Sequence, residues 1–263
     1  MKRVSLFSSL IAIIICLLSA TSCEIDNYDA PDATIQGTLY DHHGQPLQVV
    51  HGREYIRIRD ISWGKNDETR YTANRNLRVQ QDGTYIHTKQ FAGEYRLLPY
   101  QGNFFPFWDA DDTVRDGDDG GILVNISGVT TQNFTVIPFL TIEWVEDPKV
   151  VMVEGRPYIE CTVRFTRNQK EGYAQPNLRD ARLFVSRTVN PSAMVSELFP
   201  TDVAITNAQE GQDITFRTAR DLRYTGINYW VRVTMRCSNP AGTTYPNMDN
   251  ANNCTTIKQI FVP

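Results

Sequence analysis

The stretch Tyr158–Phe165 reads YIECTVRF, and its side chains alternate strictly between apolar and polar. Ile159, Cys161, Val163 and Phe165 fall on one face, because side chains of an extended chain alternate with a period of two residues. An alternation of this kind predicts a β-strand with one face in a core and the other toward solvent. The strand therefore indicates a half-buried antiparallel sheet.

The same period recurs along the rest of the chain. Asn228–Met235 alternates in the same way, and short runs rich in Thr, Val, Ile, Tyr and Phe fill the chain from Thr34 onward. Asp82-Gly83, between two such runs, predicts a β-hairpin. No stretch sustains helical periodicity over three turns. We predict an all-β fold of two β-sandwich domains, residues 34–138 and 139–263.

The N-terminus has the order of a secretory signal. Two basic residues precede the apolar run Leu6–Leu18, and three small residues precede Cys23. The run is shorter than the roughly 20 apolar residues that span a bilayer. The small-residue junction resembles the bacterial lipobox, in which the cysteine is lipidated and becomes the mature N-terminus. We expect residues 1–22 to be a signal peptide, Cys23 the lipidation site and residues 23–33 a tether; an ordinary cleaved signal is the alternative.

Composition and motifs argue against two classes of function. The formal net charge is −4, and no basic patch or RNA-type aromatic motif is present, so we expect no nucleic-acid partner. The chain lacks G-x-S-x-G, H-E-x-x-H, Walker and G-x-G-x-x-G motifs. Acidic residues are plentiful, so a two-carboxylate glycosidase stays open, but no pair of them is singled out. We expect a protein that is not an enzyme and needs no cofactor.

Three cysteines follow the signal and the lipidation site: Cys161, Cys237 and Cys254. Because three is odd, at most one intrachain disulfide forms. A Cys237–Cys254 disulfide would close a long polar loop and is the pairing we favour. A Cys161–Cys237 disulfide of the immunoglobulin type competes with it, and a free buried Cys161 is also ordinary.

The segment Tyr100–Gly121 combines aromatic rings with carboxylates. A flat ring can stack on the apolar face of a sugar while carboxylates accept hydrogen bonds from its hydroxyls. The alternative is that the phenylalanines cover the sandwich core and the aspartates form a solvated loop. The candidate glycan-binding residues are Tyr100, Phe105, Phe107, Trp108 and Asp109, with Trp108 the first choice.

The same aspartates provide the oxygen ligands that Ca²⁺ prefers. The candidate ligands, in two D-x-D pairs, are Asp109, Asp111, Asp116 and Asp118. The EF-hand pattern is absent, because the twelfth position counted from Asp109 is Gly120 rather than a glutamate. We expect at most a calcium loop of another kind.

Residues 33 to 138 resemble the carboxypeptidase regulatory-like, transthyretin-type β-sandwich. The resemblance rests on Ile35–Leu39 followed by Asp41, Gly44 and Pro46, then on Gln81–Tyr85 and on Ala92–Leu97, in the family's order. It implies an accessory scaffold without catalytic residues. The later strand Asn228–Met235, in which a tyrosine precedes alternating valines, resembles one of an immunoglobulin-like or fibronectin type III sandwich.

Cys23 together with Asp26–Gly37 resembles a family of uncharacterised Bacteroidota surface lipoproteins, which pair these two domain types. Acidic residues soon after the lipidated cysteine resemble the signal that exports such proteins to the outer face of the outer membrane. The resemblance implies SusC/SusD-like outer-membrane partners and a role in polysaccharide uptake. We expect non-catalytic glycan binding. The alternative is a structural or interaction module that positions partner proteins of a transporter at the surface.

Overall fold

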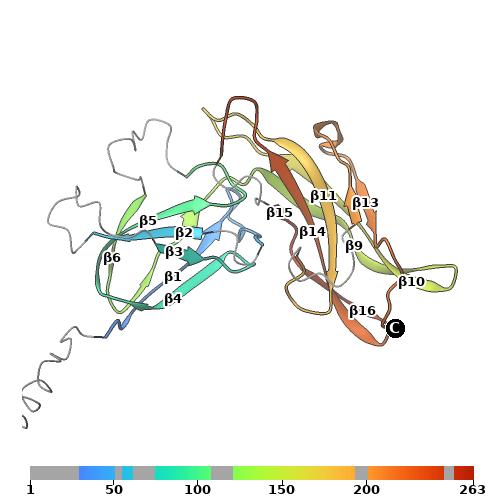
Figure 1. The fold of residues 1–263 in the computed structure, drawn as a ribbon, viewed down its shortest axis with the longest axis horizontal. Coiled ribbons are helices and arrows are strands. Elements are labelled where there is room, and N and C mark those ends of the chain that lie inside the picture. Colours follow the sequence, from blue (N-terminus) through green and yellow to red (C-terminus); the bar gives the residue numbers. More distant parts are fainter. Residues whose placement is uncertain (1–29, 51–54, 62–74, 108–120, 193–200, 246–251) are drawn as a thin grey trace, which may run out of the picture.

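The computed structural model describes residues 30–50, 55–61, 75–107, 121–192, 201–245 and 252–263. In these ranges the chain forms strands and one 3₁₀ turn, Asn207–Gln209, and no helix that is long and apolar enough to cross a membrane. The strands divide into two sandwiches that lie side by side (Figure 1). The all-β prediction is confirmed.

The first sandwich consists of two four-stranded sheets. One has the order β4-β1-β7, with β8 also paired to β1, and the other has the order β3-β2-β5-β6. The strands of the first sheet are β1 (Ala33–Tyr40), β4 (Thr84–Gln90), β7 (Val129–Thr131) and β8 (Phe134–Thr135). Those of the second are β2 (Tyr55–Asp60), β3 (Arg75–Arg78), β5 (Gly93–Gln101) and β6 (Ile122–Ile126).

The predicted hairpin at Asp82-Gly83 is wrong, although the turn itself is present. Gly83 has a φ of +82°, and its N–H donates to the carbonyl of Gln80 at 3.0 Å. The strands on either side, β3 and β4, belong to different sheets, so the turn carries the chain across the sandwich. The turn residues have the local signature of a hairpin, and only the core decides which sheet each strand joins.

The second sandwich packs a three-stranded sheet against a five-stranded sheet. The orders are β13-β10-β9 and β12-β11-β14-β15, with β16 also paired to β14. The smaller sheet contains β9 (Leu140–Val153), β10 (Arg156–Arg167) and β13 (Ile214–Arg217). The larger contains β11 (Asn177–Ser186), β12 (Thr201–Val203), β14 (Ile227–Ser238), β15 (Asn252–Cys254) and β16 (Lys258–Val262).

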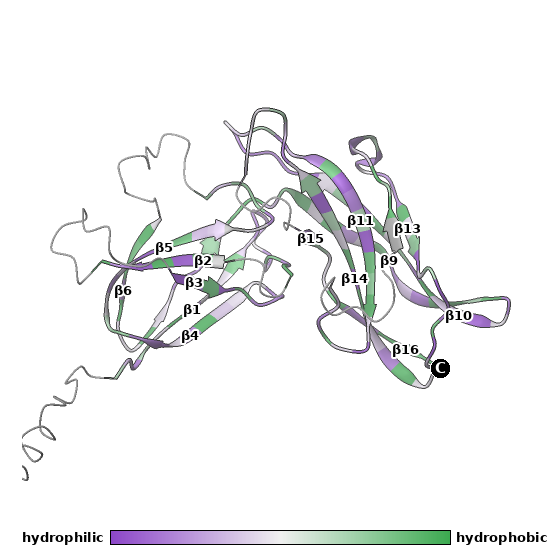
Figure 2. Ribbon diagram, viewed as in Figure 1, coloured by the Kyte–Doolittle hydropathy of each residue, from purple (hydrophilic) through white to green (hydrophobic). Residues whose placement is uncertain are grey.

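The alternating stretches lie where their periodicity predicts. Tyr158–Phe165 lies within β10 and Asn228–Met235 within β14, and their apolar side chains are buried in the second core. Figure 2 shows the alternation of hydropathy along these strands. The Tyr229 hydroxyl donates to the carbonyl of Tyr224 at 3.0 Å, which is the tyrosine corner of immunoglobulin-like sandwiches.

Candidate interdomain binding site

The two domains are joined through a fully buried cation. Arg232, on β14, is 1% exposed. Its Nε donates to the Thr255 carbonyl in its own domain at 2.9 Å, and its Nη1 donates to the Val49 carbonyl of the first domain at 2.7 Å. Two longer contacts reach Gln48 Oε1 at 3.5 Å and the Gln81 carbonyl at 3.4 Å. Arg232 therefore fixes the segment that follows β1 against the second sandwich.

A set of asparagine amides forms a second link between the domains. Asn103 Nδ2 donates to the carbonyls of Asn252, at 2.8 Å, and Gln48, at 3.1 Å. In return, Asn253 Nδ2 donates to the Asn103 carbonyl at 2.9 Å. Asn103 and Asn253 are buried, at 1% and 2% exposure. Hydrogen bonds between buried amides have defined directions, so they set the orientation of one domain against the other.

An aromatic side chain crosses the same boundary. Phe104 packs in the core of the first domain, whereas its neighbour Phe105 packs in the core of the second. Phe105 lies 5.0 Å from Phe139 and 6.0 Å from Tyr245 between ring centroids. Because consecutive side chains of an extended chain point to opposite sides, one short segment contributes to both cores.

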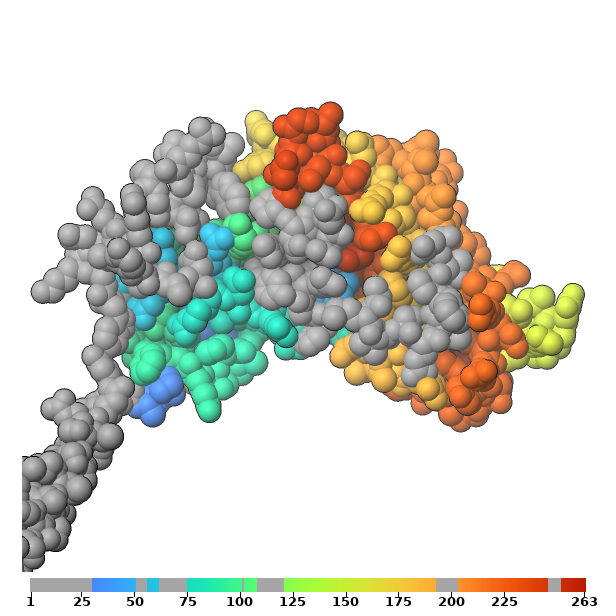
Figure 3. All heavy atoms as spheres, viewed as in Figure 1, coloured from blue at the N-terminus to red at the C-terminus, as the bar shows by residue number. Residues whose placement is uncertain are grey.

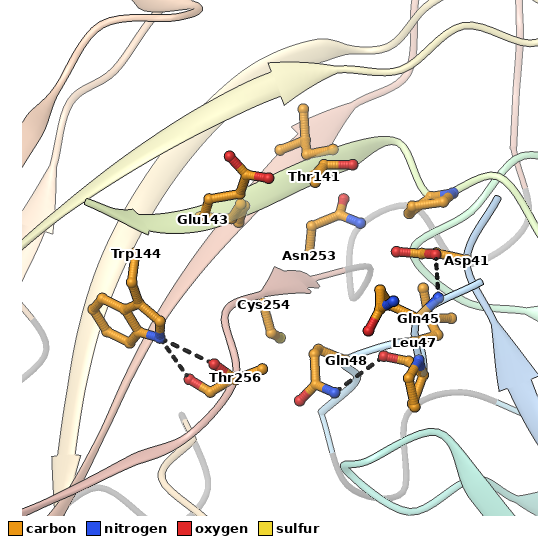
Figure 4. Close-up of a pocket in the computed structure, with 14 residues that line it drawn as sticks. Asp41, Gln45, Leu47, Gln48, Thr141, Glu143, Trp144, Asn253, Cys254 and Thr256 are labelled. Atoms are coloured by element: carbon orange, nitrogen blue, oxygen red, sulfur yellow. Dashed lines mark hydrogen bonds between the residues drawn. The ribbon is translucent and has the colours of Figure 1, made fainter. Parts of the chain in front are cut away.

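A cavity of about 450 Å³ lies at this junction (Figure 4). Three parts of the chain line it: the turn after β1, the first half of β9, and β15 with Thr256. The lining residues with polar side chains are Asp41, Gln45, Gln48, Thr141, Glu143, Asn253 and Thr256, and those with mainly apolar side chains are Pro46, Leu47, Pro138, Leu140, Ile142, Trp144 and Cys254. A cavity with an apolar wall and a few convergent polar groups is the usual form of a small-ligand site.

The turn that forms one wall is held by Asp41. Its Oδ1 accepts the backbone N–H groups of His43, at 2.9 Å, and Gln45, at 2.8 Å. An aspartate that accepts backbone N–H groups in this way stabilises a tight turn. The turn is further closed by the Asp41 N–H, which donates to the Gln45 carbonyl at 2.8 Å. The wall is therefore formed before a ligand binds.

Trp144 lies on β9, the edge strand of the smaller sheet, and forms the opposite wall of the cavity. Its indole N–H donates to the carbonyl and the hydroxyl of Thr256, at 3.1 and 3.2 Å, and both contacts are visible in Figure 4. The bond connects the edge of the smaller sheet to the chain between β15 and β16. Trp144 is half-buried and packs against the second core, so its ring is fixed in position.

Asn253 places an unpaired acceptor at the same site. Its Oδ1 is buried and has no hydrogen-bond partner within the described ranges, and Figure 4 shows the amide between Thr141 and Asp41. Asn253 is 2% exposed, so its amide forms part of the cavity wall.

The residues that the sequence predicts to bind glycan do not form one site in the structure. Phe105 is 1% exposed, so its ring is unavailable to a ligand and this assignment is wrong. Phe107 is half-buried and packs edge-on against Phe134, and Tyr100 lies under the guanidinium of Arg57, 3.4 Å from the ring centroid. The structure brings none of these three residues into the lining of the cavity.

The remaining predicted site residues lie outside the described ranges: Cys23, Trp108, Asp109, Asp111, Asp116 and Asp118. Within the described ranges no group of three metal-ligating side chains occurs, and the calcium prediction remains a prediction.

The predicted Cys237–Cys254 disulfide is not formed in the structure, in which Cys161, Cys237 and Cys254 are all buried. In the register of β14 with β15, Cys254 lies opposite Thr234 rather than opposite Cys237. Cys254 instead lines the cavity, and its thiol contacts the Asn252 carbonyl at 3.3 Å.

No local pattern in the sequence predicts the cavity residues. Asp41, Trp144 and Asn253 are more than 100 positions apart from one another in the chain, and each has an ordinary local setting. The Glu143-Trp144 pair is the one local signal, since it places a carboxylate beside an aromatic ring as the segment after Tyr100 does.

Comparisons with known proteins agree with the fold. A protein from Bacteroides uniformis of the DUF3823 family is 24% identical, with a TM-score of 0.70, and the match covers 89% of this chain and 100% of that one. A second Bacteroides uniformis protein, named "putative carbohydrate binding protein", is 20% identical with a TM-score of 0.61 over 88% of this chain and 100% of its own. A Parabacteroides merdae protein of the DUF3823 family is 17% identical, with a TM-score of 0.61 over the same shares.

No curated protein matches the chain. The family model "Protein of unknown function (DUF3823) N-terminal domain" matches residues 33–137, which is the first sandwich. The chain thus carries, in residues 33–137, an N-terminal domain of the uncharacterised DUF3823 family.

Proposed function

We propose that this protein binds glycan without cleaving it, in the cavity between its two domains. The observation that carries the proposal is the lining, in which amides, carboxylates and hydroxyls surround an apolar wall that includes Trp144. A sugar presents the matching surface, with hydroxyls around its edge and C–H groups on its faces. Tryptophan suits such a ligand, because its ring is both flat and amphipathic.

One of the similar structures supports this reading. The Bacteroides uniformis protein named for carbohydrate binding has the same fold over its whole length. Because its identity to this chain is 20%, the similarity supports the fold and leaves the ligand to be tested.

The chemistry of the lining favours binding over hydrolysis. Among the described lining residues, Asp41 and Glu143 are the carboxylates, and one oxygen of Asp41 already accepts two backbone N–H groups. A glycosidase needs one carboxylate to donate a proton and another to attack or to activate water. An aspartate whose oxygen holds a turn suits positioning better than either task.

The place of action belongs to the same proposal. We assign the chain to the outer membrane, anchored through Cys23 and facing the exterior, as an accessory to a SusC/SusD-like transporter. The signal-like residues before Cys23 and the acidic stretch after it support this assignment. β1 begins at the end of the first domain that is remote from the second, so a tether of about ten residues would leave the cavity accessible (Figures 1 and 3).

The binding test uses a soluble form without the lipidated cysteine, Glu24–Pro263, titrated calorimetrically with a panel of plant, mucin and microbial polysaccharides. We expect one or more to bind, and Trp144→Ala to weaken the binding at least about tenfold, the effect of losing a central aromatic contact. Trp230→Ala is the matched control, because Trp230 is also half-buried on a strand but lies outside the cavity lining.

Two further variants test whether the glycan binds in the cavity or on the segment after Tyr100. Gln48→Ala shortens a side chain that lines the cavity, whereas Trp108→Ala removes the ring that the sequence predicts to bind glycan. Loss of binding in Trp108→Ala with full binding in Trp144→Ala and Gln48→Ala would move the site to that segment. If no polysaccharide of the panel binds, the proposal of glycan binding is overturned.

A second function, the positioning of partner proteins, is favoured by one observation. Leu123 on β6 and Val129 on β7 are 60% and 70% exposed, and both strands are edges of their sheets. Exposed apolar side chains on sheet edges are a usual feature of protein contacts. Leu123→Lys together with Val129→Lys should release a transporter partner in cross-linking of whole cells and leave glycan binding intact.

A further inference from the structure

The charges around the cavity have one sign. Among the described residues that line it, the ionisable side chains, apart from the Cys254 thiol, are those of Asp41 and Glu143, and none is a lysine, arginine or histidine. In the described part of the chain both side-chain hydrogen bonds of Asp41 go to Oδ1, which leaves Oδ2 for a ligand. A ligand in the cavity therefore meets negative charge from both domains.

The charge of Glu143 is not neutralised by its neighbour across the sheet. Arg164 lies opposite Glu143 in the register of β10 with β9. Its guanidinium is bound instead to Asp213, with Nε at 2.9 Å and Nη2 at 2.6 Å from Oδ1. In the described part of the chain Glu143 forms no ion pair, and its side chain is exposed.

Arg232 does not offer a site for an anion either. It contacts the lining residue Gln48, but its guanidinium is covered by both domains and is 1% exposed. Its donors already face the carbonyls of Val49 and Thr255 at 2.7 and 2.9 Å. A ligand carboxylate would have to separate the domains in order to reach it.

We infer that the cavity selects neutral glycans and rejects glycans that carry carboxylate or sulfate groups. This inference rests on the proposed function and names its ligand class. A neutral sugar brings many O–H donors to the carboxylates of Asp41 and Glu143. A uronic acid or a sulfated sugar replaces a donor with an anion, and a like charge placed against a protein carboxylate weakens binding.

The experiment compares one glycan in two charge states. The neutral glycan that binds best is taken from the panel, and a form of it is prepared in which the primary hydroxyls are oxidised to carboxylates. A third form, in which these carboxylates are methyl-esterified, restores neutrality at similar size. We expect the carboxylate form to bind at least about tenfold more weakly and the ester to recover most of the affinity.

Glu143→Gln then tests the cause. The variant keeps the shape of the side chain and removes its charge. The ratio of the Kd of the carboxylate form to the Kd of the neutral form should therefore fall by at least about threefold. Glu146→Gln is the matched control, because Glu146 lies on the same strand outside the lining. Added salt should lower the same ratio of Kd values in the unmodified protein, since salt screens exposed charges.

The outcomes distinguish the inference from the proposed function. If the neutral form binds and the carboxylate form binds equally well, the neutral selectivity is overturned while glycan binding stands. An unchanged ratio in Glu143→Gln overturns it as well. If no neutral glycan binds at all, the proposed function fails and the selectivity fails with it.

Discussion

At the scale of single residues, Arg232 is the side chain on which the junction depends most. A buried guanidinium is tolerated because carbonyl oxygens from both domains surround it. We expect Arg232→Met to lower the free energy of unfolding by about 2–4 kcal/mol, since it leaves those carbonyls without donors. Arg164→Met, which removes a half-exposed ion pair with Asp213, should cost less than about 1 kcal/mol. Urea denaturation measures both, and equal losses would contradict this role for Arg232.

Also at the scale of residues, two buried thiols should make the fold sensitive to alkali. Burial raises the pKa of Cys161 and of Cys237 from 9.0 to about 12. The folded protein therefore keeps both thiols protonated at a pH where the unfolded chain has lost these protons. The stability that these two thiols contribute is full below pH 9 and should be lost as the pH rises from about 9 to about 12.

The urea midpoint measured from pH 8 upward tests this prediction. In Cys161→Ala the midpoint should fall less steeply with rising pH. Iodoacetamide should leave both thiols unmodified in the native protein at pH 8 and modify them in concentrated urea. Rapid labelling of the native protein would show that these positions are open to solvent.

At the scale of elements, β1 depends on a glycine that lets other strands approach. A Cβ at Gly37 would lie 1.8 Å from the Gln132 carbonyl oxygen and 2.9 Å from the Tyr85 ring. We expect Gly37→Ala to cost more than about 2 kcal/mol, because the Gln132 backbone must move and the Tyr85 hydroxyl donates to the same carbonyl oxygen.

Gly44→Ala is the comparison for this element. Gly44 has a φ of +78° and open space around it, so the change should cost only the conformational strain of about 1–2 kcal/mol. Thermal unfolding of the two variants separates the effects. A smaller loss for Gly37→Ala than for Gly44→Ala would mean that β1 can shift away from its neighbours.

At the scale of the whole molecule, Phe105 couples the stability of the two domains. It belongs to the segment that follows β5, yet it fills the core of the second sandwich. Phe105→Ala should cost about 3–5 kcal/mol, whereas Phe91→Ala, at a 40% exposed ring, should cost less than about 1 kcal/mol.

A fragment test checks the same coupling. The fragment Phe139–Pro263 lacks Phe105, so it should be less stable than a fragment that begins at Gly102. The urea midpoints of the two fragments measure the difference. Equal midpoints would show that the second domain does not need the ring.

By itself the sequence determined the class of the fold and the faces of its strands. Alternation in Tyr158–Phe165 and Asn228–Met235 depends only on the geometry of an extended chain, and β10 and β14 bury the side chains it selects. Only the tertiary structure decided which sheet receives the strand after Gly83, which core receives Phe105, and that Cys237 and Cys254 are not joined by a disulfide. The cavity belongs to this second group, because Asp41, Trp144 and Asn253 become neighbours only when two separate sandwiches meet. Local patterns record which face of a strand is buried, but the partner that buries it comes from residues far along the chain.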